Sequence, residues 1–231
     1  MRTSQPAKVD LLILGAGWTS TFLIPLLQKE KITYAATTTT GRDGTYKFKF
    51  EHDDADTTGE PSEDEDGLQQ YAALPPAKTV LITFPITSKE GTRHLYNFYS
   101  KTHSAQKESF QWIQLGSTGI WSIENQDLWV TRHSPYDKGN ARAGAEDELL
   151  ALGGCVLNLA GLWGGERVVK HWVDRVAGSK EMLRGKGSLH MIHGLDVARA
   201  ILAVHRNFKQ YAAGERFVSP KHGYFQLETH G

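Results

Sequence analysis

Short apolar runs alternate with amphipathic stretches along most of the chain. These runs, together with one segment that alternates with period two, predict strands at Val9–Leu14, Ile32–Thr37, Tyr46–Phe50, Thr79–Phe84, Phe110–Leu115 and Cys155–Leu159. Apolar side chains at helical spacing predict helices after the first strand and over residues 91–107, 137–152, 168–176 and 195–205. Apolar strands that alternate with helices are typical of a parallel sheet covered on both faces. We therefore expect an α/β fold with a doubly wound parallel sheet.

Proline and polar residues refine this pattern. Pro25 is expected near the start of the first helix, where proline is best tolerated. Val168 and Val169 belong to the apolar stripe predicted for the helix over 168–176. The segment His52–Gln70 is rich in Asp, Glu, Gly, Ser and Thr, which predicts a solvated loop with a short helix. Its acidity could instead suggest metal binding, although the acids lack the spacing of a calcium loop.

Composition narrows the classes of partner. The 231 residues contain 26 Lys and Arg and 26 Asp and Glu, so the zero net charge favours a small molecule over nucleic acid or an anionic membrane. The apolar runs are too short to span a membrane. The single cysteine, Cys155, cannot form an internal disulfide, which fits a reducing compartment and a cytoplasmic localisation. The dispersed histidines lack a zinc-binding spacing, so no metal is expected.

A glycine-rich turn follows the first strand. Gly15, Gly17 and Ser20 have the spacing GxGxxS between a buried-type strand and a helix. In a Rossmann fold the first glycine allows the tight turn and the second lets the backbone approach a pyrophosphate, while the third position needs a small residue. Trp18 and Thr19 complete the turn, and the helix N-terminus presents free N–H groups to phosphate. The context therefore predicts binding of NAD(P), and the alternative is a purely structural turn.

The end of the second strand bears on the choice of dinucleotide. Sites that prefer NAD often place Asp or Glu there to bind the ribose 2′-hydroxyl. This chain instead has Thr39, Thr40 and Arg42. Hydroxyls and a guanidinium suit a 2′-phosphate, so NADP is favoured while NAD stays open. Phe84 and Pro85, at the end of the fourth strand, complete the predicted cofactor-binding set.

Two further loops follow strands whose carboxyl ends should face the ligand. Ser117 and Thr118 follow the fifth strand, where they could polarise a substrate carbonyl or simply cap the turn. The loop Ala160–Arg167 follows the sixth strand and is rich in glycine. Arg167 could bind an anion there or form a surface salt bridge.

The order of these motifs resembles the atypical and extended short-chain dehydrogenase/reductase (SDR) superfamily, in particular the NAD(P)-binding, epimerase-like proteins of the YeeZ type. The matching motifs are GAGWTS at Gly15, TTTTGR at Thr37, TVLITFP at Thr79, LGSTGIW at Leu115, WVTRHSP at Trp129, ARAGAEDELL at Ala141, LAGLWGGER at Leu159 and HMIHGLDVARAI at His190. The resemblance implies one Rossmann domain over residues 1–231, with a short substrate-side region within 160–231. It also implies an oxidoreductase or epimerase that acts on a small molecule.

The sequence departs from this superfamily at the expected catalytic helix. Active members pair a Ser or Thr with Tyr-x-x-x-Lys, and the corresponding positions here fall near Lys138 and Arg142. Arg142 could hold the nicotinamide ribose, and Tyr136 could replace the missing tyrosine. Similar proteins also continue beyond the position of residues 216–220, so the substrate region looks abbreviated. The cleft is then either open or completed by a second subunit in a homodimer.

Three functions are compatible with these residues. The first is an NADP-dependent oxidoreductase or epimerase, in which Ser117 and Thr118 polarise a carbonyl and Tyr136 or water supplies the proton. The second is a redox-silent NADP-binding sensor or regulatory module, which the missing Tyr-x-x-x-Lys supports. The third is a non-redox isomerase, cyclase or dehydratase that uses the same cleft. The substrate cannot be read from the fold class.

Overall fold

The computed structural model describes residues 6–52, 65–105, 109–121, 131–171, 177–184 and 190–218. Several sequence predictions lie partly outside these ranges. The parts outside are residues 53–64 of the polar loop, 106–107 of the helix predicted over 91–107 and 129–130 of the WVTRHSP motif. They also include residues 172–176 of the helix predicted over 168–176, residue 189 and the tail after 218.

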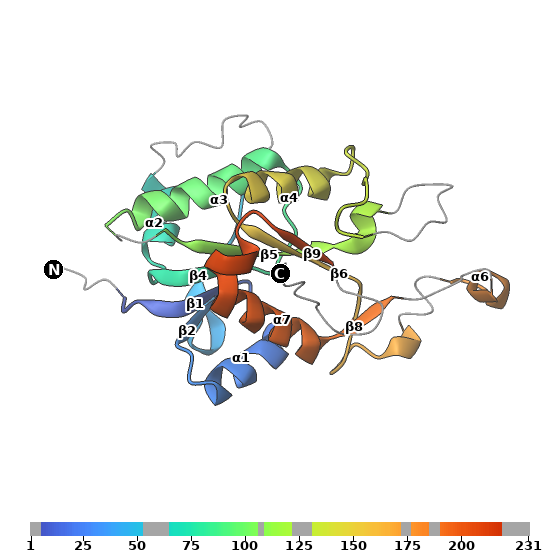
Figure 1. Cartoon of the computed structure of the whole chain (residues 1–231). Coiled ribbons are helices and arrows are strands. Elements are labelled where there is room, and N and C mark those ends of the chain that lie inside the picture. The colour runs from blue at the N-terminus through green and yellow to red at the C-terminus, as the bar shows by residue number, and fades with distance from the viewer. Residues whose placement is uncertain are drawn as a thin grey trace.

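Seven parallel strands form the central sheet (Figure 1), in the order β3-β2-β1-β4-β5-β6-β9. The strands are β1 (Val9–Leu14), β2 (Tyr34–Thr38), β3 (Tyr46–Lys47), β4 (Ala77–Ile82), β5 (Gln111–Ser117), β6 (Cys155–Leu159) and β9 (Arg216–Val218). A second, two-stranded parallel sheet pairs β7 (Gly161–Trp163) with β8 (Met191–His193). From β1 the chain first adds β2 and β3 on one side and then crosses over to add β4, β5, β6 and β9 on the other side, as in a Rossmann fold.

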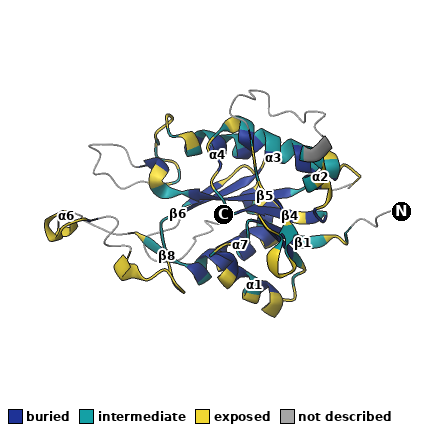
Figure 2. Cartoon of the chain, turned by 180° about the vertical axis from the view of Figure 1, so that it is seen from behind, coloured by how far each residue is buried: buried dark blue, intermediate teal, exposed yellow. Residues whose placement is uncertain are grey.

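Helices cover both faces of the central sheet (Figures 1 and 2). On one face lie α1 (Ser20–Lys29) and α7 (Gly194–Asn207), and on the other lie α2 (Glu65–Ala72), α3 (Lys89–Thr102) and α4 (Ala141–Ala151). The short helix α6 (Lys180–Arg184) lies away from the sheet. None of the described helices is long and apolar enough to cross a membrane. The predicted doubly wound α/β architecture is therefore confirmed.

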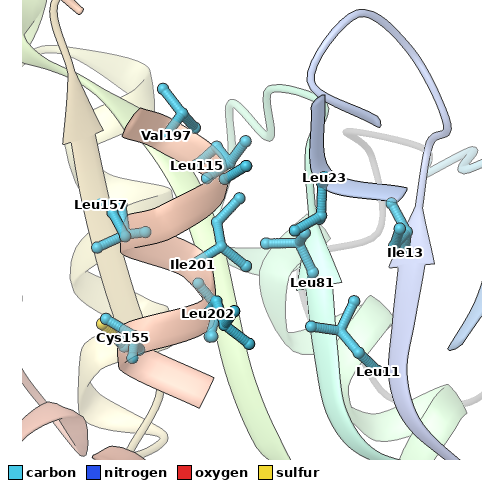
Figure 3. Close-up of a cluster of buried hydrophobic side chains, with 14 of the residues drawn as sticks. Leu11, Ile13, Leu23, Leu81, Leu115, Cys155, Leu157, Val197, Ile201 and Leu202 are labelled. Carbon is cyan, nitrogen blue, oxygen red and sulfur yellow. The ribbon is translucent and has the colours of Figure 1, made fainter. Parts of the chain in front are cut away.

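The alternation of side chains along each strand divides the core into two layers. Leu11 and Ile13 of β1 face α1 and α7, whereas Leu12 and Leu14 face α2 to α4. Figure 3 shows the first layer, in which strand residues pack against Leu23, Val197, Ile201 and Leu202 from the two helices. Cys155 is fully buried in this layer, and burial raises the pKa of its thiol. Both faces of the sheet are thus buried, which explains why its strands are apolar without alternation.

Local capping shifts the bounds of two helices from their predicted positions. The helix expected over 91–107 begins at Lys89, because the Ser88 hydroxyl accepts a hydrogen bond from the Gly91 N–H at 3.1 Å, and it ends at Thr102. The helix expected over 137–152 begins only at Ala141, because the side chain of Asn140 caps it. Such caps fix a helix start more sharply than apolar periodicity does.

Three other sequence predictions are wrong in detail. The strand expected at Tyr46–Phe50 is only two residues long: after Lys47 the Phe48 N–H donates one last hydrogen bond to the carbonyl of Thr38, the final residue of β2, and Phe50 stacks on Phe84. Pro25 is the sixth residue of α1 rather than near its start, and it lies on the exposed side. Val168 and Val169 are 50% and 38% exposed, so they do not form the predicted core stripe.

Candidate functional site

The carboxyl ends of the central strands surround a cleft of about 590 Å³. Its lining includes ten of the residues proposed from the sequence: Gly15, Gly17, Trp18, Thr19, Thr39, Thr40, Arg42, Phe84, Ser117 and Arg142. Five other proposed residues do not line it: Ser20, Pro85, Thr118, Tyr136 and Lys138. The cleft thus brings together the proposed cofactor residues except Ser20 and Pro85, whereas Tyr136 and Lys138, proposed for catalysis, are not part of its lining.

Two threonines from neighbouring strands hold the glycine turn in place. The Thr37 hydroxyl accepts a hydrogen bond from the Gly15 N–H at 2.9 Å, and the Thr37 carbonyl accepts one from Ala16 at 2.7 Å. The Thr83 hydroxyl donates to the Gly15 carbonyl at 2.5 Å. Gly15 has φ +94°, and a Cβ there would lie 2.7 Å from the Thr83 hydroxyl oxygen. The turn therefore requires glycine at this position, and its two threonine supports were missed by the sequence analysis.

Gly17 faces open space in the same turn. A Cβ built on Gly17 would meet no atom within 4 Å. Among the described residues, the backbone N–H groups of Trp18 and Thr19 have no hydrogen-bond acceptor. Unpaired N–H groups at a helix N-terminus attract an anion. Ser20, the third motif position, is buried and its hydroxyl has no partner, so its small size serves packing rather than ligand contact.

A second turn is organised at the end of β2. The Thr38 hydroxyl accepts hydrogen bonds from the N–H groups of Gly41 and Arg42, at 3.0 and 3.2 Å. Gly41 has φ +72°, a left-handed conformation that favours glycine. The side chain of Arg42 is 69% exposed, and its contact with the 90% exposed Asp43 is 3.9 Å long, which is too loose and solvated to hold the guanidinium in place. The guanidinium of Arg42 can therefore reach an anion in the cleft.

A buried polar network supports the end of β5. The Ser117 N–H donates to Glu146 at 3.2 Å, and the Ser117 carbonyl accepts from the Asn158 amide at 3.0 Å. Asn158 also donates to Glu146 at 2.8 Å, and Arg216 of β9 pairs with the same carboxylate. Glu146, Asn158 and Arg216 are all nearly or fully buried. These three residues were not among the proposed site residues, and they fix the backbone that carries Ser117 into the cleft.

The hydroxyls of Ser117 and Thr118 take different positions. Ser117 lines the cleft and its hydroxyl accepts a hydrogen bond from the Gly119 N–H at 3.1 Å. The Thr118 hydroxyl turns away and donates to the Leu159 carbonyl at 3.4 Å. Thr118 therefore ties the turn after β5 to the last residue of β6, and Ser117 is the hydroxyl available to a ligand.

Tyr136 and Lys138 form a separate cluster around Asp147. The Tyr136 hydroxyl donates to Asp147, and the Lys138 ammonium donates to Tyr136 at 2.8 Å and to Asp147 at 3.1 Å. These bonds raise the pKa of Lys138. Burial alone would raise the pKa of Asp147, but the bonds from Tyr136 and Lys138, together with the charge of Arg216, hold it below its usual value. The cluster therefore keeps Asp147 charged and engages the tyrosine proton.

The cleft is electropositive. Arg42, Arg142 and Arg167 line it, and no Asp or Glu belongs to the lining formed by the described residues. Within the described part of the chain, the side chains of Arg142 and Arg167 form no ion pair. A cleft with cations of this kind and free N–H groups suits a ligand that carries several phosphates.

Comparison with known proteins supports the fold. No family model and no curated protein matches the sequence. Vestitone reductase from alfalfa (Medicago sativa) has a TM-score of 0.58 at 17% identity, over 91% of this chain and 76% of that one. UDP-N-acetylglucosamine 4-epimerase from Bacillus cereus has 0.56 at 14%, over 91% and 77%. A wide-type short-chain dehydrogenase/reductase from Veillonella parvula, in complex with NADP, has 0.54 at 14%, over 96% and 99%. This chain therefore shares the SDR and epimerase fold, as its motifs predicted.

Proposed function

We propose that this chain binds NADP in the cleft and acts as an oxidoreductase or epimerase of the atypical SDR type on a small carbonyl or hydroxyl compound. The observation that carries the proposal is the glycine turn, where Gly17 faces open space and the N–H groups of Trp18 and Thr19 are unpaired. These groups would hold the pyrophosphate. Thr39, Thr40 and Arg42 would hold the 2′-phosphate at the other turn.

The remaining lining residues suggest how a substrate is bound. A bound nicotinamide supplies or accepts a hydride. Ser117 would donate a hydrogen bond to the substrate oxygen, and Arg142 would hold the nicotinamide ribose. The proton is expected from Tyr136 or from water. Because the Tyr136 hydroxyl is already bonded to Asp147 and lies outside the cleft lining, water is the better source.

The Tyr136 cluster also supports a second candidate, a redox-silent NADP-binding sensor. Neither Tyr136 nor Lys138 lines the cleft, so the part of the lining that the structure describes holds no counterpart of the usual acid of this superfamily. Turnover separates the two candidates. An oxidoreductase oxidises NADPH in the presence of some member of a carbonyl panel, and an epimerase inverts a hydroxyl-bearing carbon of some substrate without net change in the cofactor. A sensor binds NADPH tightly and leaves every member of both panels unchanged.

The cofactor assignment is tested by titrating NADP⁺ and NAD⁺ against the chain by calorimetry. Arg42→Ala should weaken NADP⁺ binding by about 10-fold or more, the usual value of a charge-assisted hydrogen bond, and leave NAD⁺ binding nearly unchanged. Arg184→Ala is the matched control, because Arg184 is an exposed arginine outside the cleft lining. If Arg42→Ala leaves the ratio of the two affinities unchanged, Arg42 does not bind a 2′-phosphate.

A further inference from the structure

Arg167 rests on the ring of Trp18 at the edge of the cleft. Its guanidinium carbon lies 4.4 Å from the centre of the indole ring, and both residues line the cleft. A guanidinium stacked on an aromatic face keeps its N–H donors free at the edge. The backbone N–H of Trp18 is one of the two donors in the glycine turn that have no acceptor among the described residues. The guanidinium of Arg167 therefore lies beside that turn.

The loop that carries Arg167 is closed by backbone hydrogen bonds. Gly164 and Arg167 exchange two N–H···O bonds, at 3.0 and 3.1 Å. The indole N–H of Trp18 donates to the Gly164 carbonyl at 3.0 Å. Gly164 has φ +113°, and a Cβ there would lie 2.4 Å from the ring of His193. Trp18 therefore does two things, since it fixes the loop through its N–H and supports the guanidinium with its ring.

A chain of aromatic side chains anchors Trp18 itself. The rings of Trp18 and Phe22 are 5.0 Å apart, those of Phe22 and His193 5.3 Å, and those of His193 and Trp163 4.6 Å, all edge to face. These residues come from the start of α1 and from the β7–β8 sheet. Edge-to-face contacts at these distances are favourable. The small sheet is thus attached to the glycine turn, and Arg167 has a defined position relative to it.

We propose that Arg167 is an anion-binding residue of the cleft, which donates hydrogen bonds to phosphate oxygens beside the glycine turn. The phosphate belongs either to the pyrophosphate of the dinucleotide or to an anionic substrate bound next to it. The inference rests on the proposed function, because it names a further ligand contact in the same cleft. The observations behind it do not involve Arg42. They are the stacking of the Arg167 guanidinium on the Trp18 ring and the absence of any ion pair to Arg167 among the described residues.

The experiment compares Arg167→Ala with the control Arg184→Ala, using NADP⁺ and 2′-AMP as probes. A contact to the pyrophosphate predicts that Arg167→Ala weakens NADP⁺ binding by about 10-fold or more but leaves 2′-AMP binding unchanged, because 2′-AMP reaches only the Arg42 end. Arg167→Lys should restore part of the loss, since lysine keeps the charge without the planar fork. Arg184→Ala should change neither affinity.

Two further readouts complete the test. If the phosphate belongs to the substrate, NADP⁺ affinity is unchanged in Arg167→Ala, but binding of inorganic phosphate to the NADP⁺-saturated protein is lost. Unchanged binding of both NADP⁺ and inorganic phosphate in Arg167→Ala would overturn the inference. If the wild-type chain binds no dinucleotide, the proposed function fails, and titration of the chain with inorganic pyrophosphate decides on Arg167 separately. Equal pyrophosphate affinity of the wild type and Arg167→Ala would then exclude the anion contact.

Discussion

Gly15 and Gly17 stand two positions apart in one turn but have different surroundings. Gly15 adopts a positive φ and is crowded by Thr83 and Phe84. Gly17 has no atom within 4 Å of the position that a Cβ would take. A side chain at Gly15 would therefore strain the fold, whereas one at Gly17 would fill only open space in the cleft.

This difference predicts opposite outcomes for two alanine variants. Gly15→Ala should lower the free energy of unfolding by about 1 to 3 kcal/mol, because it adds backbone strain and a close contact with Thr83. Gly17→Ala should unfold like the wild type but bind NADP⁺ at least about 10-fold more weakly, because its methyl group blocks the pyrophosphate. Urea unfolding and calorimetric titration measure the two effects. Wild-type affinity in Gly17→Ala would mean that no phosphate approaches this turn.

The site residues that the sequence could predict are those that lie in one contiguous motif after a strand. Gly17, Arg42 and Ser117 are of this kind, and each lines the cleft. Thr37 and Thr83 could not be predicted, because they support Gly15 from positions 22 and 68 residues away. The sequence shows that both are polar residues at strand ends. Their contact with Gly15 arises only because β2 and β4 lie on either side of β1 in the sheet.

At the scale of elements, three short strands were not predicted from the sequence. The strands β7, β8 and β9 contain three residues each, too few for a period to be recognised. β9 is held at the sheet edge by more than its pairing with β6. Arg216 on this strand reaches Glu146 and Asp147 of α4 and Asn158 of β6. The position of β9 thus depends on a buried ion pair.

The Arg216 network predicts a large loss of stability when one partner is removed. Arg216→Met should lower the free energy of unfolding by about 3 to 5 kcal/mol, because it leaves the fully buried Glu146 carboxylate without its cation. Arg206→Met is the matched control. Arg206 pairs with Glu30 at 2.7 Å on the surface, where solvent screens the charges, so its loss should cost far less. Urea unfolding compares the two, and an equal cost would mean that the buried pair gives no extra stability.

For the molecule as a whole, the repeated strand and helix periods were enough to predict the layers. The apolar strands β1, β4 and β5 had to be covered on both faces, and α1 and α7 on one side and α2 to α4 on the other do so. The region of 160 to 184 was harder to predict, because exposed apolar residues such as Val168 and Met182 follow no core stripe. Periodicity reports burial in a common core, and the described residues of this region contribute little to that core.

One buried histidine joins α7 to the central sheet, and its burial predicts that stability depends on pH. His205 of α7 lies 2.7 Å from the hydroxyl of Thr79 on β4, and Thr79 donates its proton to Gln111 on β5 at 2.8 Å. The Thr79 oxygen is therefore left to accept from Nδ1–H of a neutral His205. Burial, reinforced by the charge of Lys78, lowers the pKa of His205 to about 4, although Asp10 partly opposes this shift. The ring is thus uncharged in the folded chain at neutral pH.

The lowered pKa predicts that acid weakens the fold through this ring. Below its usual pKa of 6.5, His205 binds a proton in the unfolded chain, but the folded chain does not take up that proton until about pH 4. The contribution of His205 to the free energy of unfolding should therefore be fully present above pH 6.5. It should fall by up to about 3 kcal/mol as the pH is lowered from 6.5 to 4. His205→Asn keeps an N–H donor for Thr79 but cannot be protonated. Urea unfolding across the window should give a smaller pH slope for this variant, and identical slopes would show that His205 does not titrate between the folded and unfolded states.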